Sequence, residues 1–306
     1  MPKVKKQHYV PQFYLRRFAI DDKLFLFDKF TQKVVPTNVR DAGSGSYFYD
    51  LPQKLMPPEA DEIDEQIVEK ALGEMESVFA VALDKSLATV ERKRRINQKQ
   101  KPAMAFFMAL QFLRTPEQRQ SGIELEEALA NVLLKFHPDL TDADREYRVK
   151  FNEEYAAFSH AQFMMDPKVW EEFTGILLRH IWIIGVNNTA QPLYTSDNPI
   201  VRQPHKQHPH MSYSGLASEG IEIDFPLSPR YILLIYERTA FSRYLRLENK
   251  CIPISADNVT YFNAAQISQS YRQIYAPSDS FDLVREVCGE HPEWCSPHKR
   301  RWTHNQ

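Results

Sequence analysis

The chain has 306 residues, of which 43% are apolar and 25% are charged, with 40 acidic and 38 basic side chains. These proportions are those of a globular protein, and they exclude a collagen-like, coiled-coil or wholly disordered chain. The net charge of −2 gives no overall positive field, so contact with nucleic acid would need a local basic patch.

Membrane and export signals are the next class to consider. The longest apolar run is about half of the roughly 20 residues that a membrane helix needs. The N-terminus reaches Pro11 without the apolar stretch of a signal peptide. The three cysteines are too few for a disulfide framework and are typical of a reducing cytosol. We therefore expect a cytoplasmic protein with no membrane contact.

The first part of the chain predicts a helical turn and a small β element. Pro11 and the aromatic residues at helical spacing after it predict a short helix over residues 11–19. The β-branched and aromatic runs 24–29 and 33–39 predict two antiparallel strands, and 46–50 predicts a third. This order of elements does not favour a dinucleotide-binding start.

The middle of the chain, residues 59–180, is predicted to be helical. Apolar residues recur every three or four positions over about 59–91, with acidic residues in the first turn, which indicates a long amphipathic helix. An apolar segment over 98–114 predicts a central helix that Pro116 ends or kinks. Further helices are expected over 119–136, 142–164 and 167–179.

The last third changes to strands. Aromatic and β-branched clusters between residues 180 and 238 predict a mostly antiparallel sheet, and a helix is expected over 256–273. The fold class is therefore α+β, with a central helical bundle flanked by N-terminal short strands and a C-terminal mostly antiparallel sheet. We interpret residues 1–285 as one elaborated domain and residues 286–306 as a polar, basic tail.

Two motifs are unusual enough to suggest a family. The opening His-Tyr-Val-Pro-Gln-Phe-Tyr-Leu-Arg from His8 and the Thr-Ser-Asp-Asn-Pro from Thr195 resemble the bacterial family known as domain of unknown function 4238. The resemblance covers roughly residues 8–276 and implies a self-contained bacterial domain, without an activity. Other similar landmarks are Gln111–Pro116, His160, Trp182, Phe225–Pro229, Asn263 and Tyr275.

Polar residues within apolar segments form the candidate site. Burying them is costly unless they are paired, so they form either a structural network or the lining of a pocket. Two imidazoles, a guanidinium and a carboxylate suit acid–base hydrolysis of a phosphate ester. We expect His8 or His160 as the general base and Asp197 as the group that orients the imidazole or binds a metal. The expected substrate-binding residues are Gln12, Gln111, Arg114 and Asn198.

The same residues have a purely structural alternative. Asp197 would form a turn before Pro199, and Arg114 would cap a helix end, each with local partners. The two cases differ in geometry, because catalysis needs His8, Arg114 and Asp197 in one water-accessible cleft.

Two clusters have the composition of metal sites. In the tail, two Cys-x-x-His pairs would enclose a tetrahedral zinc, or else would simply be solvated. The polar loop 202–220 carries a histidine cluster that would take a divalent metal or remain empty. The residues of the tail cluster are Cys288, His291, Cys295 and His298, and those of the loop are His205, His208 and His210.

Basic side chains are densest at Arg92–Arg95, with Lys99 and Lys101 close behind, and again at Lys299–Arg301. Such runs are usually solvated helix ends, which the helix dipole favours. The alternative is a local patch for a nucleotide or a nucleic acid.

Two hypotheses follow for the function. The first is a hydrolase acting on a phosphate-containing substrate, either a nucleotide or a nucleic acid. The second is a non-catalytic ligand-sensing or protein-interaction module, for example in a stress or phage response. The oligomeric state is not indicated by the sequence.

Overall fold

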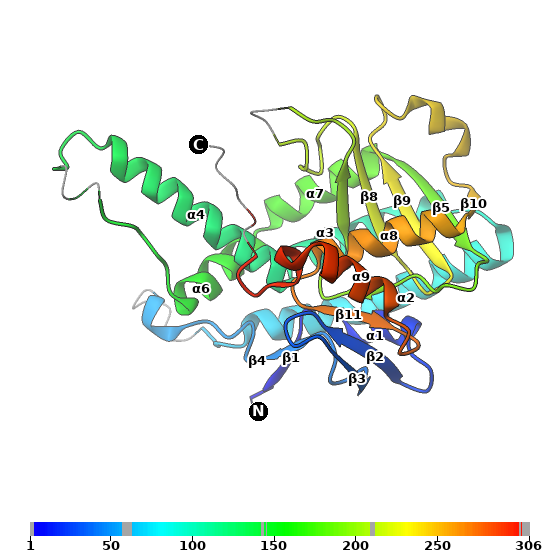
Figure 1. Ribbon diagram of the computed structural model, residues 1–306, viewed down its shortest axis with the longest axis horizontal. Coiled ribbons are helices and arrows are strands. Elements are labelled where there is room, and N and C mark those ends of the chain that lie inside the picture. Colours follow the sequence, from blue (N-terminus) through cyan, green and yellow to red (C-terminus); the bar gives the residue numbers. More distant parts are fainter. Residues whose placement is uncertain are drawn as a thin grey trace.

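The computed structural model describes residues 3–56, 63–141, 144, 146–208, 212–299 and 301. It combines N-terminal short strands, a central group of helices and a C-terminal, mostly antiparallel sheet (Figure 1). This arrangement confirms the α+β class.

A helical turn and a hairpin follow the N-terminal motif, as predicted. Pro11 precedes helix α1 (Gln12–Leu15) and the 3-10 turn η1 (Arg16–Phe18). Strands β2 (Lys23–Asp28) and β3 (Lys33–Asn38) pair antiparallel. A separate two-stranded sheet joins β1 (Lys6–His8) to β4 (Ser44–Ser46), and the short turn η2 (Gln53–Leu55) follows it.

The helices of the middle pack mainly through the apolar α3, most of whose residues are buried. Their bounds are α2 (Ile67–Lys93), η4 (Gln98–Gln100), α3 (Lys101–Leu113), α4 (Pro116–Phe136), α6 (Glu153–Met164) and α7 (Pro167–Arg179). Thr115 caps α4 and Asp166 caps α7, each through a side chain that accepts a backbone N–H.

Two predicted helix starts were wrong. Helix α2 begins at Ile67, so the acidic residues expected in its first turn precede it, and Asp64 instead accepts a hydrogen bond from the Gln66 N–H. Residues 147–152 before α6 are not helical because α4 side chains bind their backbone. Phe151 N–H donates to Glu127, for example, at 3.0 Å.

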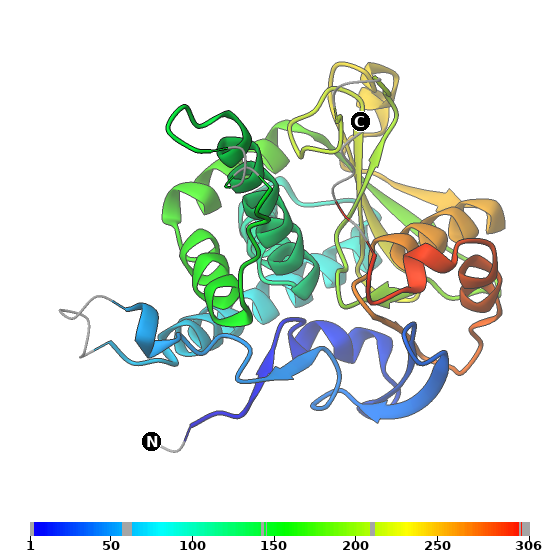
Figure 2. The ribbon, with the colours of Figure 1, turned by 60° about the vertical axis from the view of Figure 1, so that its left-hand side comes forward.

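The larger sheet lies between two helical layers (Figure 2). Its order is β10-β5-β9-β8-β7, in which β10 and β5 are parallel and the other pairs are antiparallel. Ile223 and Phe225 belong to the core shared with α3, whereas Ile183 packs with Phe262 of α8 on the opposite face. The bounds are β5 (Ile181–Asn187), β7 (Val201–Pro204), β8 (Ile221–Pro226), β9 (Tyr231–Tyr236), η5 (Ser242–Leu247), β10 (Cys251–Ile254) and α8 (Ala256–Gln269).

A second sheet pairs strands from the N-terminal part of the chain with strands from its C-terminal part. Its order is β3-β2-β11-β6, so β11 (Gln273–Ala276) lies between the N-terminal hairpin and β6 (Thr195–Ser196), antiparallel to both neighbours. The N-terminal hairpin therefore shares a sheet with β6 and β11, whereas the other C-terminal strands form the separate five-stranded sheet. The pairing of β11 with β6 also places Asp197 beside Gln273, whose carbonyl accepts the Asp197 N–H at 3.0 Å.

The C-terminal region is packed where the sequence predicts a polar tail. Helix α9 (Asp282–Glu290) crosses the expected boundary at residue 285, and the turn η6 (Pro292–Cys295) follows it. Cys288 and Cys295 form a disulfide and are each 7% exposed. The sequence predicts no disulfide framework, yet these two cysteines pair, with their Cα atoms 5.7 Å apart, within the range that a disulfide spans.

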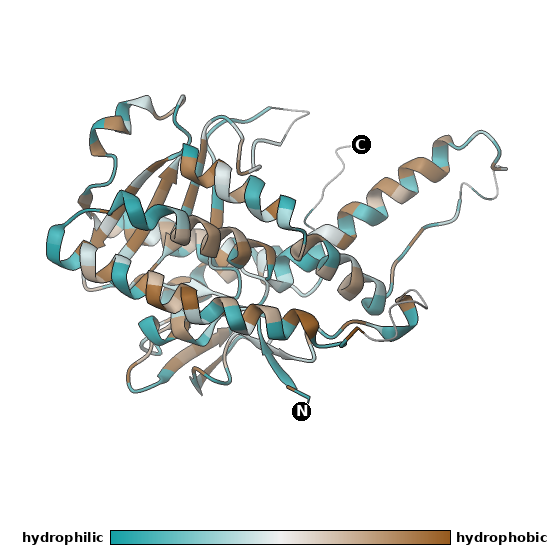
Figure 3. Ribbon diagram, turned by 180° about the vertical axis from the view of Figure 1, so that it is seen from behind, coloured by the Kyte–Doolittle hydropathy of each residue, from teal (hydrophilic) through white to brown (hydrophobic). Residues whose placement is uncertain are grey.

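Helix α4 extends from the body of the molecule, and hydrophobic residues recur along its ribbon (Figure 3). Leu129, Leu133 and Phe136 are 55%, 70% and 79% exposed. They recur at three- and four-residue spacing and therefore form one apolar stripe along the helix.

Strand β8 carries two carboxyl groups on the face that α8 covers. Asp224 is fully buried, and neither of its carboxyl oxygens has a hydrogen-bond partner among the described residues. Burial and the adjacent Glu222 raise the pKa of Asp224 well above its usual value. The Nε2 atom of His205 lies 2.5 Å from the other carboxyl group, that of Glu222.

Replacing Asp224 with asparagine is expected to stabilise the protein increasingly as the pH rises. The raised folded-state pKa means that the carboxyl contributes its full stability below the unfolded pKa of about 4 and loses it as the pH rises through the folded value. Asparagine has no such loss, so we expect little difference at pH 4 and a gain of about 1–3 kcal/mol at pH 9. Urea unfolding at both pH values measures this. Asp279→Asn on the surface is the control, and an equal effect at both pH values would contradict the prediction.

Candidate functional site

Arg114 is buried in a local network at the C-terminal end of α3. Its guanidinium donates to the backbone carbonyl of His8, to Glu76 at 2.7 Å and to the Tyr49 hydroxyl at 3.4 Å. Burial opposes the charge, but Tyr49 and Glu76 outweigh it and hold the pKa of Arg114 above its ordinary value. On the same helix, Gln111 donates to the Tyr9 carbonyl at 3.0 Å. Both side chains therefore hold the N-terminal segment in place.

The two histidines proposed as bases also bind backbone groups. His8 Nε2 lies 3.1 Å from the Arg40 carbonyl, and burial lowers the pKa of the imidazole. His160 Nε2 lies 2.7 Å from the Leu113 carbonyl, while Arg119 donates to its Nδ1 at 3.2 Å. Burial, followed by Arg119, lowers the pKa of His160 to about 3. His160 is thus a neutral imidazole with both nitrogens occupied.

Asp197 is 1% exposed and accepts three consecutive backbone N–H groups. These belong to Tyr271, Arg272 and Gln273, at 2.8, 2.7 and 2.8 Å. Burial raises the pKa of Asp197 to about 6, against the opposing effects of Lys29 and the three N–H donors. The carboxylate fixes the turn between α8 and β11.

The remaining predicted substrate-binding residues are Gln12 and Asn198. Gln12 accepts a hydrogen bond from Arg16 at 3.3 Å, on the exposed side of α1. Asn198 donates to the Gln269 carbonyl at 2.9 Å and accepts from Thr115 at 3.3 Å. The side chains of His8, Arg114 and Asp197 make separate hydrogen bonds, and Arg114 also donates to the backbone carbonyl of His8. Their partners are distant in sequence, not the local partners that the structural alternative names.

A different region of the molecule holds a polar cavity of about 920 Å³. Its walls are the first turns of α4, the β6–β7 segment, the loop after β7, the end of α8 and the residues around η6. We call it the polar cavity. Of the predicted site residues, Asn198 and His298 lie in its lining; its charged lining residues are Glu117, Arg202, Glu293, Lys299 and Arg301.

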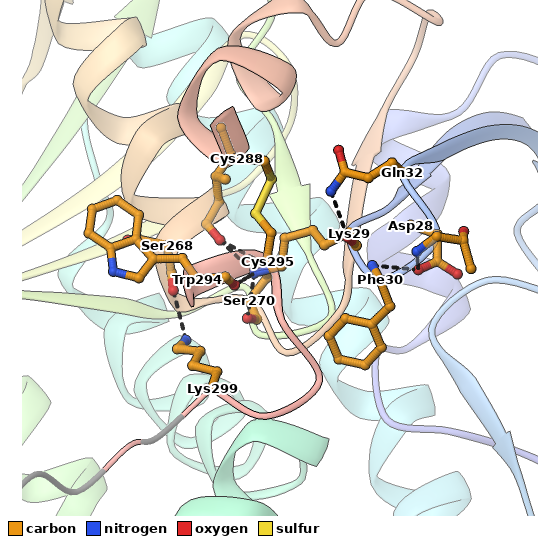
Figure 4. Close-up of a disulfide and its surroundings, with 12 residues drawn as sticks. Asp28, Lys29, Phe30, Gln32, Ser268, Ser270, Cys288, Trp294, Cys295 and Lys299 are labelled. Carbon is orange, nitrogen blue, oxygen red and sulfur yellow. Dashed lines mark hydrogen bonds between the residues drawn. A yellow bond between two sulfur atoms is a disulfide. The ribbon is translucent and has the colours of Figure 1, made fainter. Parts of the chain in front are cut away.

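Two of the basic side chains in the polar cavity are already paired. Arg301 contacts Glu117 at 2.9 Å and Glu124 at 3.0 Å. Lys299 donates to the Ser268 carbonyl at 2.7 Å and lies 3.5 Å from Glu117 (Figure 4). These contacts fasten the segment after η6 to α4 and α8.

Arg202 is the third basic side chain in the lining of the polar cavity, and its environment differs from those of Lys299 and Arg301. Its guanidinium lies 4.9 Å from the centre of the Phe112 ring, and it donates to the Ser214 carbonyl at 2.8 Å. Within the described part of the chain it takes part in no ion pair, and burial lowers its pKa. The Glu117 carboxylate acts on Arg202 electrostatically without forming an ion pair. A desolvated cation that no carboxylate contacts directly is stabilised when an anion completes its coordination.

A family model for a protein of unknown function, DUF4238, matches residues 6–280. The chain belongs to the DUF4238 family. No curated protein and no solved structure gives a significant match. The family match confirms the resemblance of the N-terminal and Thr-Ser-Asp-Asn-Pro motifs.

The zinc prediction for the C-terminal region of this DUF4238 protein was wrong. Cys288 and Cys295 bind each other, so their sulfurs are not thiolates that could bind zinc (Figure 4). His291 stacks on Trp294 with 3.9 Å between the ring centres. Nowhere in the described ranges do three or more His, Cys, Asp or Glu side chains converge as metal ligands. His210 of the other histidine cluster lies outside those ranges.

Lys29 is not among the predicted site residues, yet it is fully buried directly after β2. Its ammonium donates to the carbonyls of Ile267 and Ser270 at the end of α8, at 2.8 and 2.9 Å. It also donates to the Trp294 carbonyl at 3.0 Å, and burial lowers its pKa to about 7 (Figure 4). Lys29 and the disulfide therefore anchor the same turn, η6. A lysine directly after an apolar strand was the available signal.

The basic run Arg92–Arg95 lies in solvent at the C-terminal end of α2, with Arg94 as its cap. Lys101 is buried, unlike this run: it is 8% exposed, and its ammonium lies 3.5 Å from the Glu248 carboxylate.

Among the described helices, none is long and apolar enough to cross a membrane.

Proposed function

We propose that this DUF4238 protein binds a phosphate-bearing small molecule in the polar cavity and acts as a ligand-binding module. The observation that carries the proposal is Arg202, a partly desolvated guanidinium with no carboxylate partner among the described residues. Phosphate oxygens match the planar donor geometry of a guanidinium. A volume of about 920 Å³ is in the range of small-molecule sites.

Charge and hydrogen-bonding groups also favour an anion in the polar cavity. The lining holds Arg202, Lys299 and Arg301 against the carboxylates of Glu117 and Glu293, and Glu124, which lies outside the lining, also pairs with Arg301. Gln118, Ser212 and Ser296 add neutral polar groups around it. Hydrolysis by His8, His160 and Asp197 has less support, because backbone groups already occupy these side chains.

A protein-interaction role is a second candidate. The stripe of Leu129, Leu133 and Phe136 on α4 supports it, since exposed apolar patches often mark interaction sites. This role and ligand binding use different surfaces and are compatible.

Replacing Arg202 with glutamine is expected to weaken binding of phosphate compounds by at least about tenfold, because a hydrogen bond to a charged group is worth about 1.5–3 kcal/mol. Isothermal titration calorimetry with inorganic phosphate and a panel of nucleoside phosphates measures the change. Arg243→Gln, at an exposed arginine on η5, is the matched control and should bind as the unaltered protein does. Equal affinities for both variants, or no binding of any probe by the unaltered protein, would sink the proposal.

A further inference from the structure

A second cavity of about 460 Å³ adjoins the polar cavity. The two share Phe112, Gln118 and Arg202 in their linings. They therefore meet at the guanidinium that carries the proposed phosphate site.

The walls of the second cavity are apolar on the side away from Arg202. They include Phe173, Ile176, Leu216 and Ala217, and we call this space the apolar cavity. Phe112 and Phe173 lie with ring centres 5.9 Å apart, so α3 and α7 supply adjoining aromatic walls. Such a surface favours a ring or an alkyl group over a sugar.

The loop after β7 lines both cavities, with mainly polar residues in one and mainly apolar residues in the other. Ser212 and Ser214 line the polar cavity, whereas Gly215, Leu216 and Ala217, followed by Ser218, line the apolar one. Successive Cα atoms are about 3.8 Å apart, so the lining changes from polar to apolar over one residue. Arg202 spans this boundary, because it donates to the Ser214 carbonyl and covers Phe112.

We infer that the ligand is a phosphate monoester with an apolar group, whose phosphate binds Arg202 in the polar cavity and whose apolar group fills the apolar cavity. The inference rests on the proposed function and narrows its ligand class. Inorganic phosphate and sugar phosphates would use the polar half alone. A phosphate ester with a ring or alkyl chain would use both halves.

Calorimetry with phenyl phosphate, hexyl phosphate, AMP, ribose 5-phosphate and inorganic phosphate tests this class. Phenyl or hexyl phosphate should bind at least about tenfold more tightly than ribose 5-phosphate, from burial of the apolar group. The relative affinities of AMP and the two simple esters distinguish a nucleobase, a plain ring and an alkyl chain.

Ala217→Trp supplies the second arm of the test. Ala217 is an exposed loop residue, so the indole can fill the apolar cavity without altering the core. This variant should lose the tenfold advantage of phenyl phosphate and keep its affinity for inorganic phosphate. Ala190→Trp, on another exposed loop, should keep both.

The outcomes separate the two proposals. If inorganic phosphate binds through Arg202 but the apolar esters show no advantage, or Ala217→Trp retains that advantage, the inference fails and the proposed function stands. If no phosphate compound binds the unaltered protein, both fail.

Discussion

Replacing Asp197 with alanine is expected to lower the free energy of unfolding by about 3–5 kcal/mol. The carboxylate is 1% exposed and accepts the N–H groups of Tyr271, Arg272 and Gln273. Alanine leaves these three donors without their acceptor in a partly buried turn. Each hydrogen bond to a charged acceptor is worth about 1.5–3 kcal/mol, and three on one carboxylate are not fully additive.

Urea unfolding at pH 7 measures the loss for Asp197→Ala. Asp166→Ala is the comparison, since Asp166 caps α7 at an accessible end and should cost only about 1 kcal/mol. Asp197→Asn keeps one carbonyl oxygen as an acceptor and should fall between the two. A loss below about 1 kcal/mol for Asp197→Ala would show that the turn between α8 and β11 does not depend on this carboxylate.

Arg114→Met is expected to cost about 3 kcal/mol of stability, since it removes one member of a largely buried ion pair. The change leaves the His8 carbonyl, Glu76 and the Tyr49 hydroxyl without their donor. The estimate lies at the low end for buried pairs because the Glu76 side chain is 26% exposed.

A double-mutant cycle separates the ion pair from the other contacts of Arg114. Arg114→Met combined with Glu76→Gln should show a coupling energy of about 1 kcal/mol or more. The folded Arg114→Met protein should also keep its affinity for inorganic phosphate, since Arg114 lies outside the polar cavity. Loss of phosphate binding with unchanged stability would restore Arg114 as a substrate-binding residue.

The fold followed from sequence where local pattern and tertiary packing agree. The β-branched and aromatic runs of β2 and β3, the apolar run of α3 and the Asp166-Pro167 start of α7 all predicted their elements. The predicted start of α6 failed because Glu127, in a different helix, accepts the Phe151 N–H. When a side chain far away in the sequence binds a backbone N–H in place of the helix, the local sequence carries no signal of it.

The candidate site was harder to predict for the same reason. Most of the polar residues selected in apolar segments are buried, whereas Gln12 and His8 are only partly so. Burial alone does not reveal whether a partner is a ligand or a backbone carbonyl. His160 and Asp197 proved to have backbone partners. Arg202 has no distinctive local motif, and its significance depends on Phe112, which is 90 positions earlier in the chain.

Whether the disulfide between Cys288 and Cys295 is intact or reduced in a protein sample affects the ligand affinity measured with that sample. Under a strong reductant, the wall of the polar cavity would keep the Lys29 bond and the ion pairs of Arg301 but lose its covalent link. The fraction of molecules with a complete wall would then fall, and the apparent dissociation constant would rise by the same factor. Preparations that differ only in thiol content are therefore not interchangeable.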